Sequence, residues 1–320
     1  MIWLYVLIAL LAIILAIICV VSVYFFRFTI VGRHATIEQT LKKSENNPTY
    51  SKYYDRIIAG GEWLKNQKHE RVEIKSYDNL KLVASIYEPI EKTKNCMLLF
   101  HGWSSHPFFD FSCIVEKYCS LGANVIVVEQ RGHGESGGKY SCFGVKERYD
   151  VVSWSQYVIS RYGDDCRIIL DGISMGASTV MMAAGLGELP KNIVGIIADC
   201  GFTNAYDEFK HVMKLWYKLP PFPLLYTVEI IAKIFARFTF RQISTETELK
   251  KSTLPLLILH GEDDDFVPVE FSYRNYEASA SKNKRLLVIP GAEHGTSYMT
   301  DEEKCNEALS EFVDELFYNK

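Results

Sequence analysis

From residue 71 onward, short apolar runs alternate with segments of helix length, and this alternation restricts the fold more than any other feature of the chain. The runs are VEIKSY, LKLVASIYE, CMLLF, NVIVVE, RIILD, IVGIIAD, LPLLILH and RLLVIP. The helical segments between them include 108–121, 145–161, 174–186 and 269–280. Strands that are apolar on both faces and alternate with helices indicate an α/β fold, here a hairpin followed by a mostly parallel sheet flanked by helices.

The first 26 residues contain no charged side chain and read MIWLYVLIALLAIILAIICVVSVYFF. At about 1.5 Å of rise per residue, a helix of this length crosses a hydrocarbon core of about 30 Å. A cleaved signal peptide would need a cationic start, a shorter apolar stretch and a small-residue cleavage site, and none is evident. The bulky Ile18 before Cys19 also argues against lipoprotein processing. We therefore expect an uncleaved transmembrane anchor over residues 1–26; the alternative is a buried core helix.

Charge and cysteine usage bear on the side of the membrane that the body occupies. No lysine or arginine precedes the anchor, whereas four follow it: Arg27, Arg33, Lys42 and Lys43. This asymmetry favours a cytoplasmic body, although the rule weakens for large translocated domains. Seven cysteines lie outside the anchor, and three are on or beside predicted strands: Cys96, Cys166 and Cys200. An odd number of cysteines with buried positions predicts free thiols and favours the same compartment.

The chain divides into an anchor, a polar connector over residues 27–70 and a body over residues 71–320. The connector contains a predicted helix at 54–65 and is expected to pack against the body as a stalk. One insertion, at about 203–249, interrupts the alternation of strands and helices. Its prolines at 220, 221 and 223 exclude one straight helix, and its many aromatic residues suit a lid over a cleft. Alternatively, these aromatic residues only pack the insertion onto the body.

A Gly-x-Ser-x-Gly motif, GISMG, follows the run RIILD and precedes a good helix. A strand that enters a helix through such a tight turn holds its central residue, Ser174, in an unfavourable backbone conformation above the sheet. Small flanking residues allow the two elements to approach closely. Because a serine hydroxyl is a poor nucleophile alone, a hydrolytic role requires a base and an orienting acid.

His294 is the best candidate for the base, because it lies after the last predicted strand and before the final helix. Six of the other histidines suit surface or loop-holding roles: His34, His69, His101, His133, His211 and His260, with the last of these at a strand end. The acid should follow an intervening strand, and LPLLILHGEDDDFVPVE offers Asp263, Asp264 and Asp265. Chemistry alone does not choose among these three. Asp199 is a fallback acid that more plainly suits a loop-supporting role.

An acyl-transfer site also needs hydrogen-bond donors for the oxyanion. The amide of Met175, next to the serine, is one candidate. A second should come from the turn His101-Gly102-Trp103 after the run CMLLF. Removing such a donor typically slows turnover by roughly 100- to 1000-fold.

Five motifs, FHGWSS, EQRGHGESGG, GISMG, HGEDDDFVP and GAEHG, resemble in order and spacing those of the α/β-hydrolase superfamily. The likeness spans about residues 70–320 and is closest to bacterial membrane-anchored or cell-surface serine hydrolases of the prolyl-oligopeptidase and monoacylglycerol-lipase branches. It implies Ser174 as nucleophile, Asp264 as acid, His294 as base, and the Trp103 and Met175 amides as oxyanion donors. Relatives often carry Asp where this chain has Glu129 or Gln130, a turn-supporting position that bears little on catalysis.

The expected function is a serine hydrolase that cleaves an acyl ester or other amphiphile without a metal or organic cofactor. Its expected partners are a small-molecule or acyl substrate and, through the N-terminal helix, a membrane. The formal net charge of −4 and the lack of a basic stripe exclude nucleic acid. Two alternatives remain: a serine peptidase, and a non-catalytic membrane-tethered binding protein that keeps the fold. The resemblance suggests a cell-surface location, in contrast to charge and cysteine usage.

Overall fold

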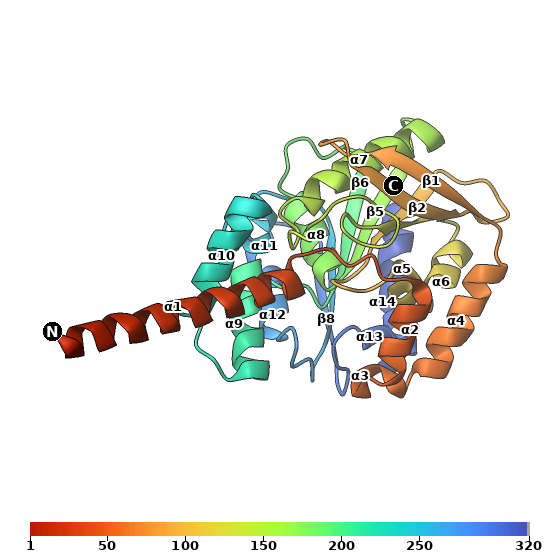
Figure 1. Cartoon of the computed structure of the whole chain (residues 1–320). Coiled ribbons are helices and arrows are strands. Elements are labelled where there is room, and N and C mark those ends of the chain that lie inside the picture. The colour runs from red at the N-terminus through yellow and green to blue at the C-terminus, as the bar shows by residue number, and fades with distance from the viewer. Residues whose placement is uncertain (319–320) are drawn as a thin grey trace.

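The centre of the computed structural model, which describes residues 1–318, is a mixed sheet of eight strands in the order β1-β2-β4-β3-β5-β6-β7-β8 (Figure 1). The strands are β1 (His69–Lys75), β2 (Lys81–Tyr87), β3 (Asn95–Phe100), β4 (Asn124–Glu129), β5 (Arg167–Ile173), β6 (Ile193–Asp199), β7 (Leu256–Gly261) and β8 (Lys284–Ile289). The first two form an antiparallel hairpin, β2 pairs antiparallel with β4, and the other neighbours are parallel. The predicted α/β class is confirmed.

Helices cover both faces of this sheet, as its two-sided apolar strands require. Along β3, Cys96, Leu98 and Phe100 face one hydrophobic cluster, while Met97 and Leu99 face the other. The first cluster includes residues of α7 (Glu147–Tyr162) and α8 (Met175–Ala183), with α12 (Glu270–Ala278) at its margin. The second includes residues of α5 (Pro107–Phe111), α6 (Val115–Ser120) and α14 (Glu302–Phe317). The period of two along the strand therefore divides the core into two layers.

The segment expected to form one helix over 108–121 is instead two short helices, α5 and α6. Ser112 lies at the end of α5, and its hydroxyl donates a hydrogen bond to the Phe109 carbonyl at 3.3 Å. A serine side chain that satisfies a backbone carbonyl in this way competes with continuation of the helix. The turn that follows places α6 against the face of the sheet that carries the second hydrophobic cluster.

The insertion is helical and contains α9 (Ala205–Val212), the π-helix η1 (Met213–Tyr217), α10 (Leu224–Phe235) and α11 (Thr245–Leu249). It packs with the end of α1 (Ile2–Thr29) in a third hydrophobic cluster, to which Phe26 and Phe209 belong. Ser22 of α1 hydrogen bonds to Thr227 of α10 at 2.5 Å. The rest of α1 projects from the body as a long apolar helix of sufficient length to cross a membrane (Figure 1).

The connector forms α2 (Ile37–Glu45), α3 (Pro48–Ser51) and α4 (Tyr54–Asn66), which pack beside α5 (Figure 1). Thr36 and Gln39 form a capping box that begins α2, and Asn47 caps α3 ahead of Pro48. A side chain at Gly60 would collide with the backbone of Ser112, so α4 lies in direct backbone contact with the end of α5. The connector is therefore folded onto the body along most of its length.

Arg131 fixes the loop after β4 from inside the protein. Its guanidinium makes two 2.6 Å hydrogen bonds to Asp150 and two 3.0 Å hydrogen bonds to Asp78. The Arg131 backbone carbonyl accepts a hydrogen bond from Nδ1 of His133. Nε2 of the same histidine accepts a hydrogen bond from the Ser104 amide. This ion pair thus positions the loop that follows β3, next to the serine motif.

We expect Arg131→Met to lower the free energy of unfolding by about 3–5 kcal/mol, because it leaves the buried Asp150 carboxylate without its partner. The matched control is Asp165→Asn, which breaks an exposed pair with Lys94 and should cost less than about 1 kcal/mol. Urea unfolding of the full chain in detergent micelles measures both changes. Equal losses for the two variants would contradict the structural role of Arg131.

Candidate active site

Ser174 occupies the sharp turn between β5 and α8, with φ 55° and ψ −114°. A positive φ is costly for a residue with a side chain, so the surrounding structure must enforce it. A Cβ atom at Gly172 would overlap the backbone of Gly176, and one at Gly176 would overlap the Phe100 carbonyl. The Ser174 amide donates to the Asp199 carbonyl at 2.8 Å. The two glycines thus permit the close approach that holds the serine above the sheet.

Three side chains from three strand ends meet at this turn. The Oγ atom of Ser174 lies 3.0 Å from Nε2 of His294, and Nδ1 of His294 lies 2.7 Å from Oδ2 of Asp264. The other oxygen of Asp264 accepts the amides of Phe266 and Val267 at 3.0 and 2.8 Å. Asp264 is buried.

The two neighbouring acid candidates, Asp263 and Asp265, are both exposed. The geometry therefore brings together Ser174, His294 and Asp264, the aspartate that the family resemblance implied among the three that chemistry alone did not separate.

Charges around the imidazole set its protonation. Burial alone would lower the pKa of His294, but the charge and hydrogen bond of Asp264 outweigh it, with smaller contributions from Asp199 and Asp110, so this pKa lies above its usual value. Burial alone would raise the pKa of Asp264, but His294 and His260 hold it well below its usual range. Asp264 is thus ionised wherever His294 titrates, and it favours the imidazolium form.

The backbone amides expected to act as oxyanion donors border the serine. A Cβ atom at Gly102 would lie 3.4 Å from that of Ser174, which places the loop after β3 next to the serine. Within residues 1–318, neither the Trp103 amide nor the Met175 amide donates a hydrogen bond to another residue. Both remain available to an oxygen bound beside Ser174.

Buried groups hold this loop rigidly. The Gly102 amide donates to Asp110 at 2.7 Å, and the Ser105 hydroxyl donates to the same carboxyl at 2.6 Å. Burial raises the pKa of Asp110 to about 6. His101 bonds through Nδ1 to the Gly102 carbonyl and through Nε2 to the Gln130 amide. Because burial lowers the pKa of His101 well below its usual value, this histidine stays neutral and serves to fix the loop.

The cleft above Ser174 has a volume of about 350 Å³, and the connector forms one of its walls. Asn47, Thr49 and Tyr50, around and within α3, line the cleft opposite Trp216 and Phe266. Thr49 donates a 2.6 Å hydrogen bond to Glu293, the residue before His294. The sequence offered no signal for this wall, because the contact joins segments about 240 residues apart that carry no shared motif.

A second, apolar pocket extends from Ser174 under the insertion and is lined by Phe143, Phe202 and Phe209 among others. Glu208 also lines it and is 3% exposed. Within the described part of the chain, neither of its carboxyl oxygens has a hydrogen-bond partner. Burial raises the pKa of Glu208 well above its usual value, so the carboxyl is held in its neutral form. Sequence reasoning missed this residue, because a glutamate within AYDEFKHV is typical of a solvated helix face.

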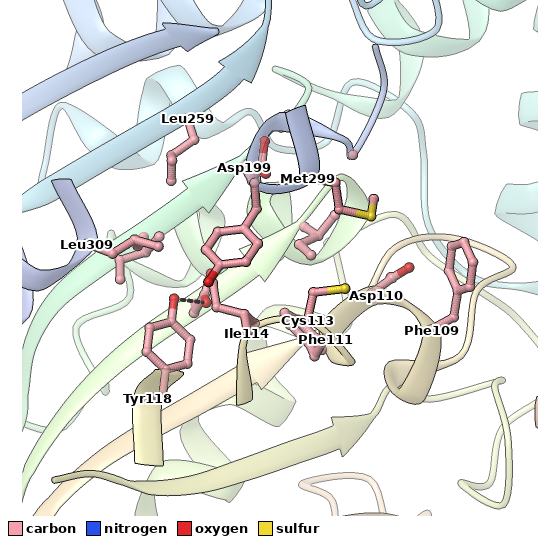
Figure 2. Close-up of a pocket in the computed structure, with 15 residues that line it drawn as sticks. Phe109, Asp110, Phe111, Cys113, Ile114, Tyr118, Asp199, Leu259, Met299 and Leu309 are labelled. Carbon is pink, nitrogen blue, oxygen red and sulfur yellow. Dashed lines mark hydrogen bonds between the residues drawn. The ribbon is translucent and has the colours of Figure 1, made fainter. Parts of the chain in front are cut away.

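Beneath the serine turn lies a smaller cavity that is bordered by three acids, the buried Asp171 and Asp199 and the half-buried Asp110. Asp110 and Asp199 are labelled in Figure 2. The third acid, Asp171, accepts a 2.6 Å hydrogen bond from the Tyr118 hydroxyl. Burial raises the pKa of Asp171 to about 7. Asp199 accepts a 3.1 Å hydrogen bond from Ser297. Asp199 therefore supports the loop behind His294 and makes no hydrogen bond to the imidazole among the described residues.

One group of side chains could in principle hold a metal ion. Ligand atoms of Cys200, Asp264 and His294 all lie within 4.8 Å of one another. Burial raises the pKa of the Cys200 thiol well above its usual value, so it remains protonated and is a poor ligand. Metal binding would also displace the hydrogen bond between Asp264 and His294. The geometry suits proton transfer better than metal ligation.

Comparison with known proteins agrees with this architecture. The model of the prolyl oligopeptidase family matches residues 109–320. The chain belongs to this family. It is 28% identical over 224 residues to the uncharacterized protein YqkD of Bacillus subtilis, covering 70% of this chain and 72% of that one. It is 23% identical to the monoacylglycerol lipase of Mycolicibacterium smegmatis, covering 67% and 86% of the two chains.

Among solved structures, an esterase of Pyrococcus furiosus is similar, with a TM-score of 0.63 and 26% identity over 78% of this chain and 92% of that one. The α/β-hydrolase resemblance drawn from the motifs is confirmed. The chain is a hydrolase of the esterase and lipase type.

Glu208→Gln should make stability less dependent on pH. An unfolded glutamate ionises near pH 4.3, whereas folded Glu208 keeps its proton to a higher pH. The wild-type protein must therefore lose stability relative to the variant as pH rises above about 4.3, until the folded pKa is passed. Urea unfolding of both proteins between pH 4 and pH 8 measures this difference. A wild-type free energy of unfolding that stays constant or rises relative to that of the variant over this range would contradict the neutral carboxyl.

Proposed function

We propose that this protein hydrolyses carboxylic esters through an acyl-enzyme on Ser174, with His294 as base and Asp264 as its orienting acid. The observation that carries the proposal is the chain of contacts from Ser174 Oγ to His294 Nε2 at 3.0 Å and from His294 Nδ1 to Asp264 at 2.7 Å. This is the relay that a serine hydroxyl needs to become a nucleophile near neutral pH.

In the proposed reaction, neutral His294 removes the hydroxyl proton as Ser174 Oγ forms a bond to the ester carbonyl carbon. The carbonyl oxygen becomes negative and is bound by the Trp103 and Met175 amides, which cost no reorganisation because they are already unpaired. The imidazolium then gives its proton to the departing alkoxide, which leaves as the alcohol. Water, deprotonated by His294, attacks the acyl-enzyme carbonyl carbon. As the bond from that carbon to Ser174 Oγ breaks and the carboxylic acid leaves, the imidazolium returns its proton to Ser174 Oγ.

The substrate that we propose is an amphiphilic acyl ester, acted on at a membrane. The apolar pocket beside Ser174 suits an acyl chain, and α1 suits a single-pass anchor. The basic residues that follow α1 favour the cytoplasmic face. In this proposal, residues 1–26 are the anchor, 27–70 the connector and 71–320 the hydrolase domain, with 203–249 as its lid.

A peptidase is the second candidate, because the pocket contains one carboxyl, Glu208, that could receive a substrate ammonium group. Its neutral form offers no charge to such a group, which favours the ester. Comparing p-nitrophenyl esters with aminoacyl p-nitroanilides separates the two. Faster turnover of the anilides, lost in Glu208→Gln, would favour the peptidase.

Ser174→Ala should abolish labelling by a fluorophosphonate probe and lower kcat/KM for p-nitrophenyl esters by roughly 1000-fold or more, because the acyl-enzyme no longer forms. The matched control is Ser178→Ala, one turn further along α8, where the hydroxyl bonds only to backbone carbonyls. Labelling that persists in Ser174→Ala would exclude this nucleophile. A wild-type protein that binds esters but neither labels nor hydrolyses them would be a binding protein.

The pH dependence of kcat/KM should report His294. Because the base must be neutral and its pKa is raised, activity should rise with pH through a midpoint above about 6.5. Asp264→Asn should lower kcat by roughly 10,000-fold and move the midpoint of the residual activity to lower pH, since the charge that raises the pKa is removed. A midpoint that does not move would contradict the assigned acid.

A further inference from the structure

The end of the membrane helix is part of the wall around the substrate site. Phe28 and Thr29, in the last turn of α1, line the apolar pocket that reaches Ser174. The Thr29 carbonyl accepts the indole N–H of Trp103 at 2.9 Å, and the Phe28 ring lies 6.1 Å from that indole. The helix that would tether the protein is therefore fixed, by direct contacts, to the loop that lies over the nucleophile.

Another apolar pocket continues outward from the apolar pocket at Ser174, along the junction of α1 with the insertion. The two pockets are narrow, with volumes of about 40 and 50 Å³. They share five lining residues: Phe28, Thr29, Phe209, Val212 and Trp216. The outer pocket adds Phe25 and residues of α10 such as Leu224. We call the pair the anchor groove; it gives a path of apolar side chains from Ser174 to the base of the anchor.

The anchor places the outer end of this groove at a membrane surface. Residues 2–20 of α1 stand clear of the body, and Ser22 is the first buried residue. Nineteen or twenty helical residues span about 30 Å, which is the thickness of the hydrocarbon core. The body therefore begins where the bilayer ends, and α10 lies beside α1 at that level (Figure 1).

The surface around this point has the composition of a membrane contact. The outer side of α10 exposes Ile230, Ile234 and Phe235, each more than half accessible. The segment 210–241 carries six lysines and arginines and one acidic residue, although the whole chain is net negative. Apolar side chains beside basic ones suit the interface of a bilayer that contains anionic lipids.

We propose that a single-chain acyl ester reaches Ser174 directly from the bilayer, with its acyl chain lying in the anchor groove between the end of α1 and the lid. This inference rests on the proposed esterase function and names its substrate class. The anchor then has two roles: it holds the enzyme at the membrane, and its last turn forms part of the acyl site.

Val212 offers the sharpest test, because it lies where the two pockets join. Val212→Trp fills the groove and should lower kcat/KM for p-nitrophenyl decanoate by roughly tenfold more than kcat/KM for p-nitrophenyl acetate. The matched control is Ile90→Trp, which adds the same ring at a fully exposed site remote from the groove. Fluorophosphonate labelling of Val212→Trp verifies an intact site, and Val212→Phe is the milder substitution if the tryptophan variant does not fold.

The outcomes separate this inference from the function on which it rests. Wild-type protein that hydrolyses neither ester would overturn the esterase proposal. Equal effects of Val212→Trp on both esters, or none on the decanoate, would overturn the anchor groove while leaving the esterase intact.

A second measurement uses the full chain in vesicles of phosphatidylglycerol and phosphatidylcholine that contain a single-chain fluorogenic ester. The double variant Ile230→Asp and Ile234→Asp should slow this reaction by roughly tenfold and leave soluble acetate hydrolysis unchanged. An unchanged vesicle rate would exclude membrane contact by α10.

Discussion

The backbone of Ser174 is held at a positive φ by contacts on both sides of the turn. Gly172 and Gly176 let β5 and α8 approach until no side chain would fit, and the Ser174 amide is bonded to the next strand. The packing of the parallel strands around this turn offsets the backbone strain at Ser174. The same sheet delivers Asp264 and His294 from two further strand ends to the hydroxyl. The candidate site thus depends on parallel strands that end at one edge, and no single loop could create it.

Nearby carboxylates raise the pKa of His294, the candidate base. Asp264 acts on His294 directly, and Asp199 and Asp110 raise the imidazole pKa further from behind. Asp110 also receives the Gly102 amide, so one carboxyl both orients the loop over the serine and adds to the field at the base. Burial of such groups costs stability, which the large two-layered core can offset. A negative surrounding favours the imidazolium, the form needed after the serine has lost its proton.

The sequence predicted the features that depend on local pattern, and missed those that depend on long-range packing. Strand and helix periods, with GISMG between RIILD and a helix, were sufficient for the fold and for the position of Ser174. Chemistry alone left the acid as one of three aspartates, and the family resemblance implied Asp264. The folded loop gives the physical reason, because the Val267 amide donates a hydrogen bond to the buried Asp264 carboxylate. Glu208 lies in a helix whose sequence is typical of a solvated face, and only the packing of α9 in the third hydrophobic cluster shows that it is buried. The wall at Tyr50 had no signal, since nothing in the connector encodes its distant partner.

The same distinction applies to the anchor. Its apolar composition predicts a membrane helix, but composition does not reveal where the membrane segment ends and the enzyme begins. Phe26 and Ile30 are buried in the cluster that contains the lid residues Phe209 and Val228. The last two turns of α1 therefore belong to the hydrolase core. In the proposed anchored arrangement, this packing fixes the orientation of the body on the bilayer. In the proposed arrangement, this rigid junction holds the groove against the lipid surface, so an acyl chain that leaves the bilayer there loses little apolar contact before it reaches the serine.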